Sequence, residues 1–437
     1  MMYRPTRRLA YAALAVAGVC LAVMIPSLAL GGQTRSKAVT LTFWSWVPNL
    51  QNEVNLFNST HPNIHVKVVN VGQGVPEYQK LTTALKAGSG APDLVQIEFQ
   101  YIPTYVTLKG LADLSKYGAS AFKNRFVPWT WAQVSKGSHV WAIPQDSGPL
   151  GLLYRKDIFD KYGLAVPTTW DQYAADAYQL HKKNPKVYLA DFPISDGGPI
   201  NGLFWQAGSR PFEVSGTTVT IRIDDPAALK VANYWGKLVK DHVIAAQPDF
   251  NSAWYTALSN GTYATMTPAA AWAPVFLQGI AKNTSGKWRA APIPQWTSGG
   301  KVNGNWGGST TAVTVQSHHP AEAAQFALWL NINLKSANMF ATKQFLFPTL
   351  NAELNSLSFK NAKLPFYGGQ QVNKVFIAAS SEVDVHFQWS PFQDYVYSQL
   401  QEQMGLAAQG KESFANALHK TQKIVVAYAK SQGFTVK

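Results

Sequence analysis

The sequence predicts an α/β protein made of two lobes joined by a hinge. At 437 residues the chain exceeds what one ordinary hydrophobic core supports, so two domains are expected. The order strand, helix, strand, helix, strand within residues 39–98 favours a parallel, doubly wound sheet. In residues 139–177, two apolar stretches are separated by a break that holds Pro144, Gly148 and Pro149. Proline cannot donate to a strand ladder and glycine adopts unusual dihedral angles, so this break suits a crossing between lobes.

The first part of the chain alternates between strand and helix patterns. Residues 39–44 and 64–71 alternate like half-buried strands, and residues 78–87 follow an amphipathic helix pattern. That helix should end at Gly88-Ser89-Gly90. The expected elements are the strands Val39–Trp44, Ile64–Val71 and Asp93–Glu98 and the helices Glu53–Asn58 and Tyr78–Ala87.

After the break, Leu150–Tyr154 is expected to form another buried strand. Thr168 should cap the following helix, with Asp171 three residues on in the manner of a capping box. The further expected elements are the strands Gly261–Thr267 and Thr311–Val315 and the helices Pro226–Lys240, Trp272–Ala281, Pro320–Leu330, Phe392–Gln403 and Lys411–Ser431.

Three hinge crossings are expected, near residues 144–149, 306–310 and 347–349. They divide the chain into an N-terminal lobe of residues 38–146 plus 309–347 and a C-terminal lobe of residues 147–308 plus 348–437. A hinge between lobes implies a cleft, and clefts between lobes are where small ligands are held.

Residues 1–29 have the order of a secretory signal peptide. Arg4, Arg7 and Arg8 precede the apolar run Leu9–Met24, and small residues before Ala29 suit cleavage. The run is short for a membrane-spanning helix. We therefore expect an exported protein, periplasmic or at the extracellular cell surface, with an uncleaved N-terminal anchor as the alternative.

Cys20 is the only cysteine, and it lies inside the expected signal peptide. A mature chain without cysteine has no disulfide, no thiolate metal site and no cysteine nucleophile. Lipid attachment at Cys20 is a second route to membrane anchoring, although Val19 stands where a small residue is expected.

Composition limits the kinds of partner. Hydrophobic residues make up 46% of the chain, which excludes a disordered protein. The formal net charge is +14, but the lysines are scattered, whereas nucleic-acid-binding proteins concentrate their charge on one element. We therefore expect no nucleic-acid partner.

The chain is rich in aromatic residues, which reach 13% and include 15 tryptophans. A sugar presents an apolar C–H face and a rim of hydroxyls, so its site needs flat rings and short polar groups. Trp44 and Trp46 close the first strand at its carboxyl end, where open α/β sheets bind ligands; the alternative is that both are core residues. Glu98 ends another strand and could accept hydroxyl hydrogen bonds. For Asp146, at the hinge, ligand binding and backbone capping both stay open.

Five stretches carry a family pattern: LTFWSW (Leu41–Trp46), FNSTHPNIHVKVV (Phe57–Val69), YQKLTTALKAGSGAPDLVQIE (Tyr78–Glu98), the block His139–Ala177 and TYATMTPAAAWAP (Thr262–Pro274). In this order they resemble extracellular solute-binding proteins of the maltose-binding type, the carbohydrate-capturing components of bacterial ABC importers. The resemblance implies a type II periplasmic-binding-protein-like fold, in which each lobe is a doubly wound, mostly parallel sheet flanked by helices. It also implies capture of a sugar, with an oligosaccharide favoured, by hinge closure, and delivery to permease subunits in the membrane. We expect a monomer.

Trp272 follows a small-residue turn, at the position where the resemblance implies a stacking ring. Trp306 precedes Gly307 and Gly308, which allow close approach of a backbone, so Trp272 and Trp306 are the leading stacking candidates. The full set of expected ligand-binding residues is Trp44, Trp46, Glu98, Asp146, Trp205, Trp272, Trp306, Gly307, Gly308 and Trp389.

Catalysis has little support in the sequence. No G-x-S-x-G, P-loop, H-E-x-x-H or C-x-x-C motif occurs, so we expect no enzyme, no catalytic residue, no cofactor and no metal. A secreted carbohydrate hydrolase is one alternative, for which Glu98 and Asp146 would be the carboxylate pair. The other alternative keeps the fold and binds a non-sugar solute. Glu382, Asp384 and His386 alternate as on one strand face, and a solvated edge of the C-terminal lobe is favoured there over a metal or hydrolase site.

Overall fold

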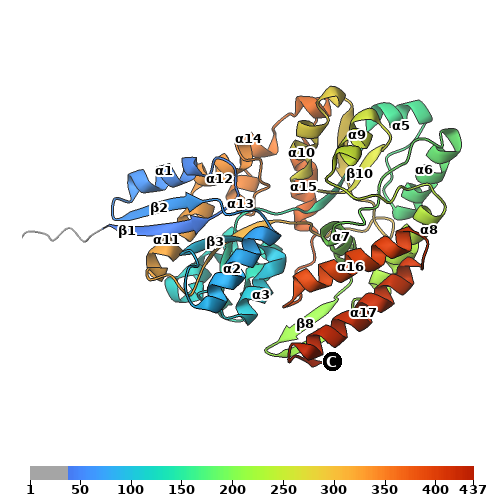
Figure 1. Ribbon diagram of the computed structural model, residues 1–437. Coiled ribbons are helices and arrows are strands. Elements are labelled where there is room, and N and C mark those ends of the chain that lie inside the picture. The colour runs from blue at the N-terminus through green and yellow to red at the C-terminus, as the bar shows by residue number, and fades with distance from the viewer. Residues whose placement is uncertain (1–37) are drawn as a thin grey trace, which may run out of the picture. The chain divides into compact units, whose positions relative to one another are not determined.

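The computed structural model describes residues 38–437 (Figure 1). Within these residues, no helix combines the length and apolar character needed to cross a membrane. The expected signal peptide, residues 1–29 with Cys20, lies outside the described residues.

A five-stranded sheet contains most of the first strands of the chain, in the order β2-β1-β3-β12-β6. Its strands are β1 (Val39–Trp44), β2 (Ile64–Val69), β3 (Leu94–Glu98), β6 (Ala142–Pro144) and β12 (Ser309–Val313). β1 runs parallel to β2 and β3, whereas β12 is antiparallel to both β3 and β6. The carboxyl ends of β1 and β3 therefore meet at one edge of the sheet, as the sequence predicts.

Helices cover this first sheet with apolar faces. Leu41 and Phe43 alternate inward on β1 and are fully buried, and the Phe43 ring meets Phe326 with centroids 5.8 Å apart. Helix α2 ends at Gly88 with φ 74°, a conformation that favours glycine. The helices and short strands of this region are α1 (Gln51–Thr60), α2 (Val75–Ala87), α3 (Ile102–Thr107), α4 (Pro128–Val134), β4 (Ser135–Lys136), β5 (His139–Val140), α11 (Pro320–Ile332) and α12 (Leu334–Thr342).

A second sheet has the order β10-β7-β11, with β7 (Leu150–Arg155) between β10 (Thr265–Ala270) and β11 (Trp288–Pro292). All its strand pairs are antiparallel, so the expectation of a mostly parallel sheet in each lobe is wrong here. Parallel pairing around this sheet occurs as single bridges, such as Tyr188 with Tyr263 and Asp191 with Ala245. Pro193 and Pro248 follow these bridges closely, and proline cannot extend a strand ladder.

Helices and a small third sheet surround the second sheet. In α6, the buried residues Trp170, Tyr173, Ala177 and Leu180 follow helical spacing and form its inner face. The helices are α5 (Lys156–Tyr162), α6 (Trp170–Lys183), α7 (Gly197–Gln206), α8 (Pro226–Lys240), α9 (Ser252–Asn260), α10 (Ala273–Ile280), α15 (Val372–Ser381), α16 (Gln393–Ala408) and α17 (Phe414–Ser431). The short helices α13 (Asn351–Leu354) and α14 (Leu357–Lys360) pack against α12, where Asn338 Nδ2 donates to Glu353 Oε1 at 3.1 Å. The third sheet consists of β8 (Phe212–Ser215), β9 (Thr218–Ile221) and β13 (Thr435–Val436).

The three expected crossing segments lie side by side between the two larger sheets. The buried Asp146 carboxylate accepts a hydrogen bond from Ser309 N at 3.0 Å and another from Ser309 Oγ, and its backbone bridges to Pro348. Gly148 N donates to Asn305 Oδ1 at 2.8 Å. A Cβ atom on Gly148 would lie 1.9 Å from the Trp306 carbonyl oxygen, so only glycine fits there. The lobe boundaries themselves stay a prediction.

The N-cap of α6 is shifted by one residue from the expected position. Thr169, not Thr168, is the cap, and its hydroxyl accepts a hydrogen bond from Gln172 N at 3.2 Å. Gln172 Oε1 reaches back and accepts from Thr168 N at 2.8 Å. The capping box is therefore present, with Gln172 in the place expected for Asp171.

We expect Thr169→Ala to lower the free energy of unfolding by about 1 kcal/mol, because an orphan amide of α6 loses its acceptor. Thr168→Ala is the matched control and should cost less, since its hydroxyl only donates to an exposed glutamine. Urea denaturation of both variants measures the difference. Equal losses would contradict the assignment of the cap to Thr169.

Candidate functional site

The carboxyl ends of β1 and β3 bring three of the expected residues to one edge of the first sheet. Trp44 and Trp46 are both half-buried, while Ser45 between them is buried and donates to Gln96 Oε1 at 2.7 Å. Neither tryptophan is therefore a fully buried core residue. The Trp46 ring meets the edge of Tyr78 at 6.1 Å.

Glu98 lies at the end of β3 and is held by the buried Tyr78. The Tyr78 hydroxyl donates to Glu98 Oε2 at 3.0 Å and accepts from Glu98 N at 3.0 Å. Burial raises the pKa of Glu98 to about 7, and the negative charges of Asp196 and Asp146 act in the same direction. Its protonation therefore changes near neutral pH, and a carboxyl group in this state exchanges hydrogen bonds readily with hydroxyls.

Trp272 and Trp306 face each other on the side of the second sheet. The Trp272 indole Nε1 donates to the Trp306 carbonyl oxygen at 3.1 Å, and the two rings meet edge to face at 4.8 Å. Gly307 and Gly308 follow with φ of 74° and 90°, the left-handed region. A Cβ atom on Gly308 would lie 2.8 Å from the Asp146 carbonyl oxygen. The glycines thus let the chain turn tightly beside the hinge, and the Trp306 side chain next to them is buried, with 7% of its surface exposed.

The sequence reasoning missed Asp196, which belongs to the same cluster. It is the N-cap of α7, where its Oδ1 accepts from Gly198 N at 2.7 Å. Burial raises the pKa of Asp196 to about 7. Gly197 and Gly198 have no side chains because Tyr397 and Trp306 fill that space: added Cβ atoms would lie 2.5 and 2.6 Å from them. In the sequence, the run Asp196-Gly197-Gly198 before a helix was the pattern that could have indicated this residue.

Trp205 and Trp389 occupy different positions from those expected. Trp205 is fully buried, stacks on Phe387 at 4.3 Å and donates its Nε1 to the Asp384 carbonyl oxygen at 2.9 Å. It is a core residue and offers no surface to a ligand. Trp389 is also buried, with its ring between Trp205 at 5.9 Å and Tyr397 at 6.4 Å.

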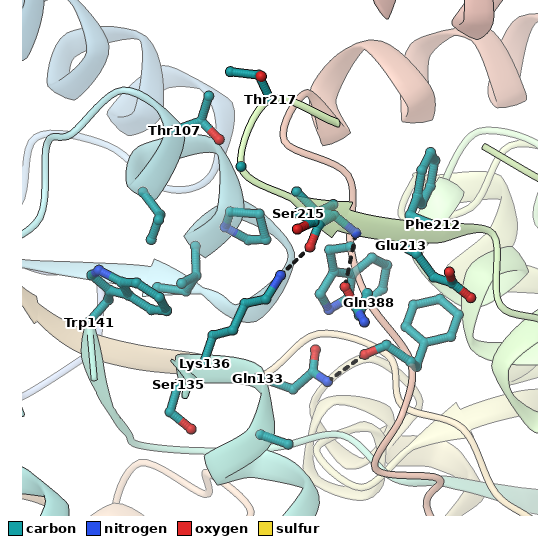
Figure 2. Close-up of a pocket in the computed structure, with 18 of the residues that line it drawn as sticks. Thr107, Gln133, Ser135, Lys136, Trp141, Phe212, Glu213, Ser215, Thr217 and Gln388 are labelled. Carbon is teal, nitrogen blue, oxygen red and sulfur yellow. Dashed lines mark hydrogen bonds between the residues drawn. The ribbon is translucent and has the colours of Figure 1, made fainter. Parts of the chain in front are cut away.

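A cavity of about 900 Å³ lies next to Trp389, outside the cluster of expected residues (Figure 2). Its walls come from α3, the end of α4, the β8–β9 hairpin and residues 385–389 and 432–434. Figure 2 shows Lys136 and Gln133 reaching across it: Lys136 Nζ donates to the Val214 carbonyl oxygen, and Gln133 Nε2 donates to the Phe387 carbonyl oxygen at 3.0 Å. Of the ten expected ligand-binding residues, Trp389 alone lines it, so this cavity is distinct from the tryptophan–carboxylate cluster.

A small cavity of about 20 Å³ lies against Trp306 and is lined by two further buried carboxylates, Asp191 and Asp249. Asp191 Oδ1 accepts from Gln247 N at 2.9 Å, and Asp249 Oδ1 accepts from the Ser195 hydroxyl at 2.5 Å. Burial raises the pKa of Asp191 to about 8, and the charge of Asp249 adds to the shift. These contacts tie together the two loops that lead to Asp196 and to α9.

Asp146, one carboxylate of the hydrolase alternative, makes its hydrogen bonds within the protein. Asp146 is engaged with Ser309 at the hinge, so it caps local structure rather than facing a ligand. Glu382, Asp384 and His386 do not form a strand: Glu382 ends α15, and Asp384 Oδ1 accepts from His386 N at 3.0 Å in a turn. The expected alternation is wrong because this local hydrogen bond bends the chain. Among residues 38–437, no group of three or more His, Cys, Asp or Glu side chains is placed to hold a metal ion.

Two α/β halves, with aromatic and acidic side chains where they meet, are the architecture of a solute-binding protein. The chain belongs to the bacterial extracellular solute-binding protein family, whose model matches residues 44–331. It is 27% identical over 313 residues to the arabinooligosaccharide-binding protein of Halalkalibacterium halodurans, covering 68% of each chain. It is 25% identical over 322 residues to the lactose-binding protein of Rhizobium radiobacter, covering 69% of this chain and 72% of that protein.

Solved structures agree on the fold. The ABC transporter associated binding protein of B. animalis subsp. lactis, in complex with beta-1,6-galactobiose, superposes with a TM-score of 0.78 at 29% identity, covering 92% of this chain and 100% of that one. The galacto-N-biose-/lacto-N-biose I-binding protein of Bifidobacterium longum, in complex with lacto-N-biose, gives 0.81 at 25% identity, covering 92% and 99%. The predicted two-lobed, type II periplasmic-binding-protein-like fold is confirmed, apart from the strand directions of the second sheet.

The stability of the protein should fall as pH rises from about 4 to about 8, in part because of Asp191. An acid whose pKa is higher in the folded than in the unfolded chain binds more protons when folded, so raising the pH favours unfolding. Asp191→Asn should remove this contribution. Urea denaturation at pH 5 and pH 8 measures it: the drop in the free energy of unfolding between the two should shrink in the variant. An unchanged drop would count against a buried, protonated Asp191.

Proposed function

We propose that the protein captures a sugar outside the cytoplasm and delivers it to a bacterial ABC importer. The observation that carries the proposal is the pair Trp272–Trp306, with Glu98 and Asp196 beside it. Flat rings suit the apolar C–H face of a sugar, and carboxyl oxygens accept hydrogen bonds from its hydroxyls. The names of the relatives support this assignment, since they bind arabinooligosaccharide and lactose, and an oligosaccharide is the favoured cargo.

Hinge closure would make the capture selective. Trp46 and Glu98 belong to the first sheet, whereas Trp272, Trp306 and Asp196 belong to the second. A ligand that contacts both groups binds the closed state better than the open state, and this difference in affinity drives closure. The crossing segments around Asp146 and Gly148 would be the hinge.

The partners and the location follow from the same assignment. The family description supports export, and the proposed partners are permease subunits in the membrane, with the protein acting as a monomer. Anchoring through the N-terminus remains part of the proposal. We propose no catalytic activity, because the relatives are named as binding proteins and Asp146 is committed to the hinge. No feature of the site favours a hydrolase or a non-sugar solute.

A thermal-shift screen against mono- and oligosaccharides tests the function. A sugar that binds only the folded protein stabilises it by mass action, by about 2.7 kcal/mol when its concentration is a hundred times the dissociation constant. We expect at least one oligosaccharide to raise the melting temperature in proportion to the logarithm of its concentration. A flat response to every sugar, with a response to peptides or polyamines, would overturn the proposal.

Trp272→Ala and Trp306→Ala should each weaken binding of the responding sugar at least tenfold, about 1.4 kcal/mol, through loss of a stacked ring and its apolar contact area. Isothermal titration calorimetry measures the affinity, and thermal unfolding without ligand checks that each variant still folds. Trp141→Ala is the control, because Trp141 is half-buried and lines the separate 900 Å³ cavity. An unchanged affinity in both Trp272→Ala and Trp306→Ala would contradict the assignment of these rings to sugar stacking.

A further inference from the structure

Three carboxylates from distant parts of the chain converge around the aromatic cluster. Glu98 ends β3, Asp196 caps α7 and Asp394 lies in the first turn of α16. Packing brings these elements together: residues 99–101, directly after Glu98, pack against α16, and so does α7. Tyr397, one turn after Asp394, lies against Gly197, the neighbour of Asp196. The three acidic groups therefore lie on elements that meet, rather than on separate surfaces.

This acidic set has no positive counterpart nearby. None of the ion pairs formed within residues 38–437 includes Glu98, Asp196 or Asp394. The groups that hold Glu98 and Asp196 are neutral donors: the Tyr78 hydroxyl on Glu98 and the backbone amide of Gly198 on Asp196. A chain with a formal net charge of +14 thus keeps its lysines and arginines out of ion pairs with these three groups.

The position of Asp196 at a helix N-terminus also disfavours a bound anion. The N-terminus of a helix, with its free amides and partial positive charge, normally attracts an anion. Here the N-terminus of α7 is already occupied by the Asp196 carboxylate, which accepts from Gly198 N. An anionic ligand therefore meets a carboxylate at this helix N-terminus instead of free amides.

We propose that Glu98, Asp196 and Asp394 make the site selective for saccharides without negative charge, so that neutral and amino sugars bind and sugar acids are rejected. The proposal rests on the proposed function and specifies its substrate class. Specificity of this kind comes from repulsion of the wrong ligand as much as from attraction of the right one. Like charges a few ångströms apart near a protein surface repel strongly enough to weaken binding by about a hundredfold.

The test compares sugars that differ only in charge. Lactose and β-1,6-galactobiose are each prepared with the 6′-hydroxymethyl group intact, oxidised to a carboxylate, converted to the neutral carboxamide, or replaced by an aminomethyl group. Isothermal titration calorimetry of the mature protein at pH 7.5 should give the amino forms an affinity at least as high as that of the neutral forms, because the carboxylates attract a cation. Binding of the carboxylate should be about a hundredfold weaker than binding of the carboxamide, which matches it in size.

The ratio of carboxamide to carboxylate affinity measures how much each acidic side chain contributes to the selectivity. Asp196→Asn and Glu98→Gln should each reduce this ratio at least threefold, whereas the control Asp160→Asn, an exposed residue paired with Lys156, should not change it. Lowering the pH to 5 should also reduce it, because burial raises the pKa values of Glu98 and Asp196 to about 7 and both become mostly protonated.

The possible failures are distinguishable. Carboxylate forms that bind within threefold of the carboxamides would overturn the charge selectivity and leave sugar capture intact. So would a ratio that is the same in Asp196→Asn, Glu98→Gln and the wild-type protein. A protein that binds only the carboxylate forms would contradict the proposal outright. Absence of binding across the whole saccharide screen would instead contradict the proposed function.

Discussion

The structure depends on how three crossing segments are held together between two sheets. Asp146 is buried there, and burial raises its pKa to about 6, while the two hydrogen bonds from Ser309 favour the charged form. A buried carboxylate is costly unless such donors surround it, so Ser309 and the backbone near Pro348 are confined to one arrangement. Gly148 and Gly308 permit this packing, because a side chain at either position would strike a neighbouring segment. The connection between the two halves is therefore narrow but well defined.

The proposed binding cluster draws different chemistry from each of the two sheets. The second sheet supplies the ring pair Trp272–Trp306, fixed by the bond from the Trp272 indole to the Trp306 backbone. The first sheet supplies Glu98 through the end of β3, fixed by Tyr78. An acidic group on each side means that closing the halves on an empty site brings like charges together. Hydroxyl donors of a neutral ligand would relieve this repulsion, which gives the ligand a direct way to favour the closed state.

Local sequence patterns predicted the helices and strands whose ends are set by neighbouring residues. The helix Pro226–Lys240 matches α8 at both ends, because Pro226 starts it and Asp225 caps it through Ala228 N at 2.8 Å. Long-range packing decided the rest. Trp205 and Trp306 were both candidates from the sequence. In the structure Trp205 stacks on Phe387, whereas Trp306 occupies the space left by the missing side chain of Gly198. Asp196 and Tyr397 lie about two hundred residues apart, and only the fold brings them together. The antiparallel second sheet was missed because strand direction is set by pairing between segments more than a hundred residues apart, which local patterns do not encode.

Trp306 shares its stretch of backbone with the connection between the halves. Its amide donates to the Gly148 carbonyl oxygen at 2.9 Å, and two residues later Gly308 packs against Asp146. Any rotation about the connecting segments must therefore also turn the indole plane. The ring that would contact the sugar and the segment about which the halves would rotate thus belong to one stretch of backbone. Ligand binding would therefore act on the hinge directly, without a series of side chains between them.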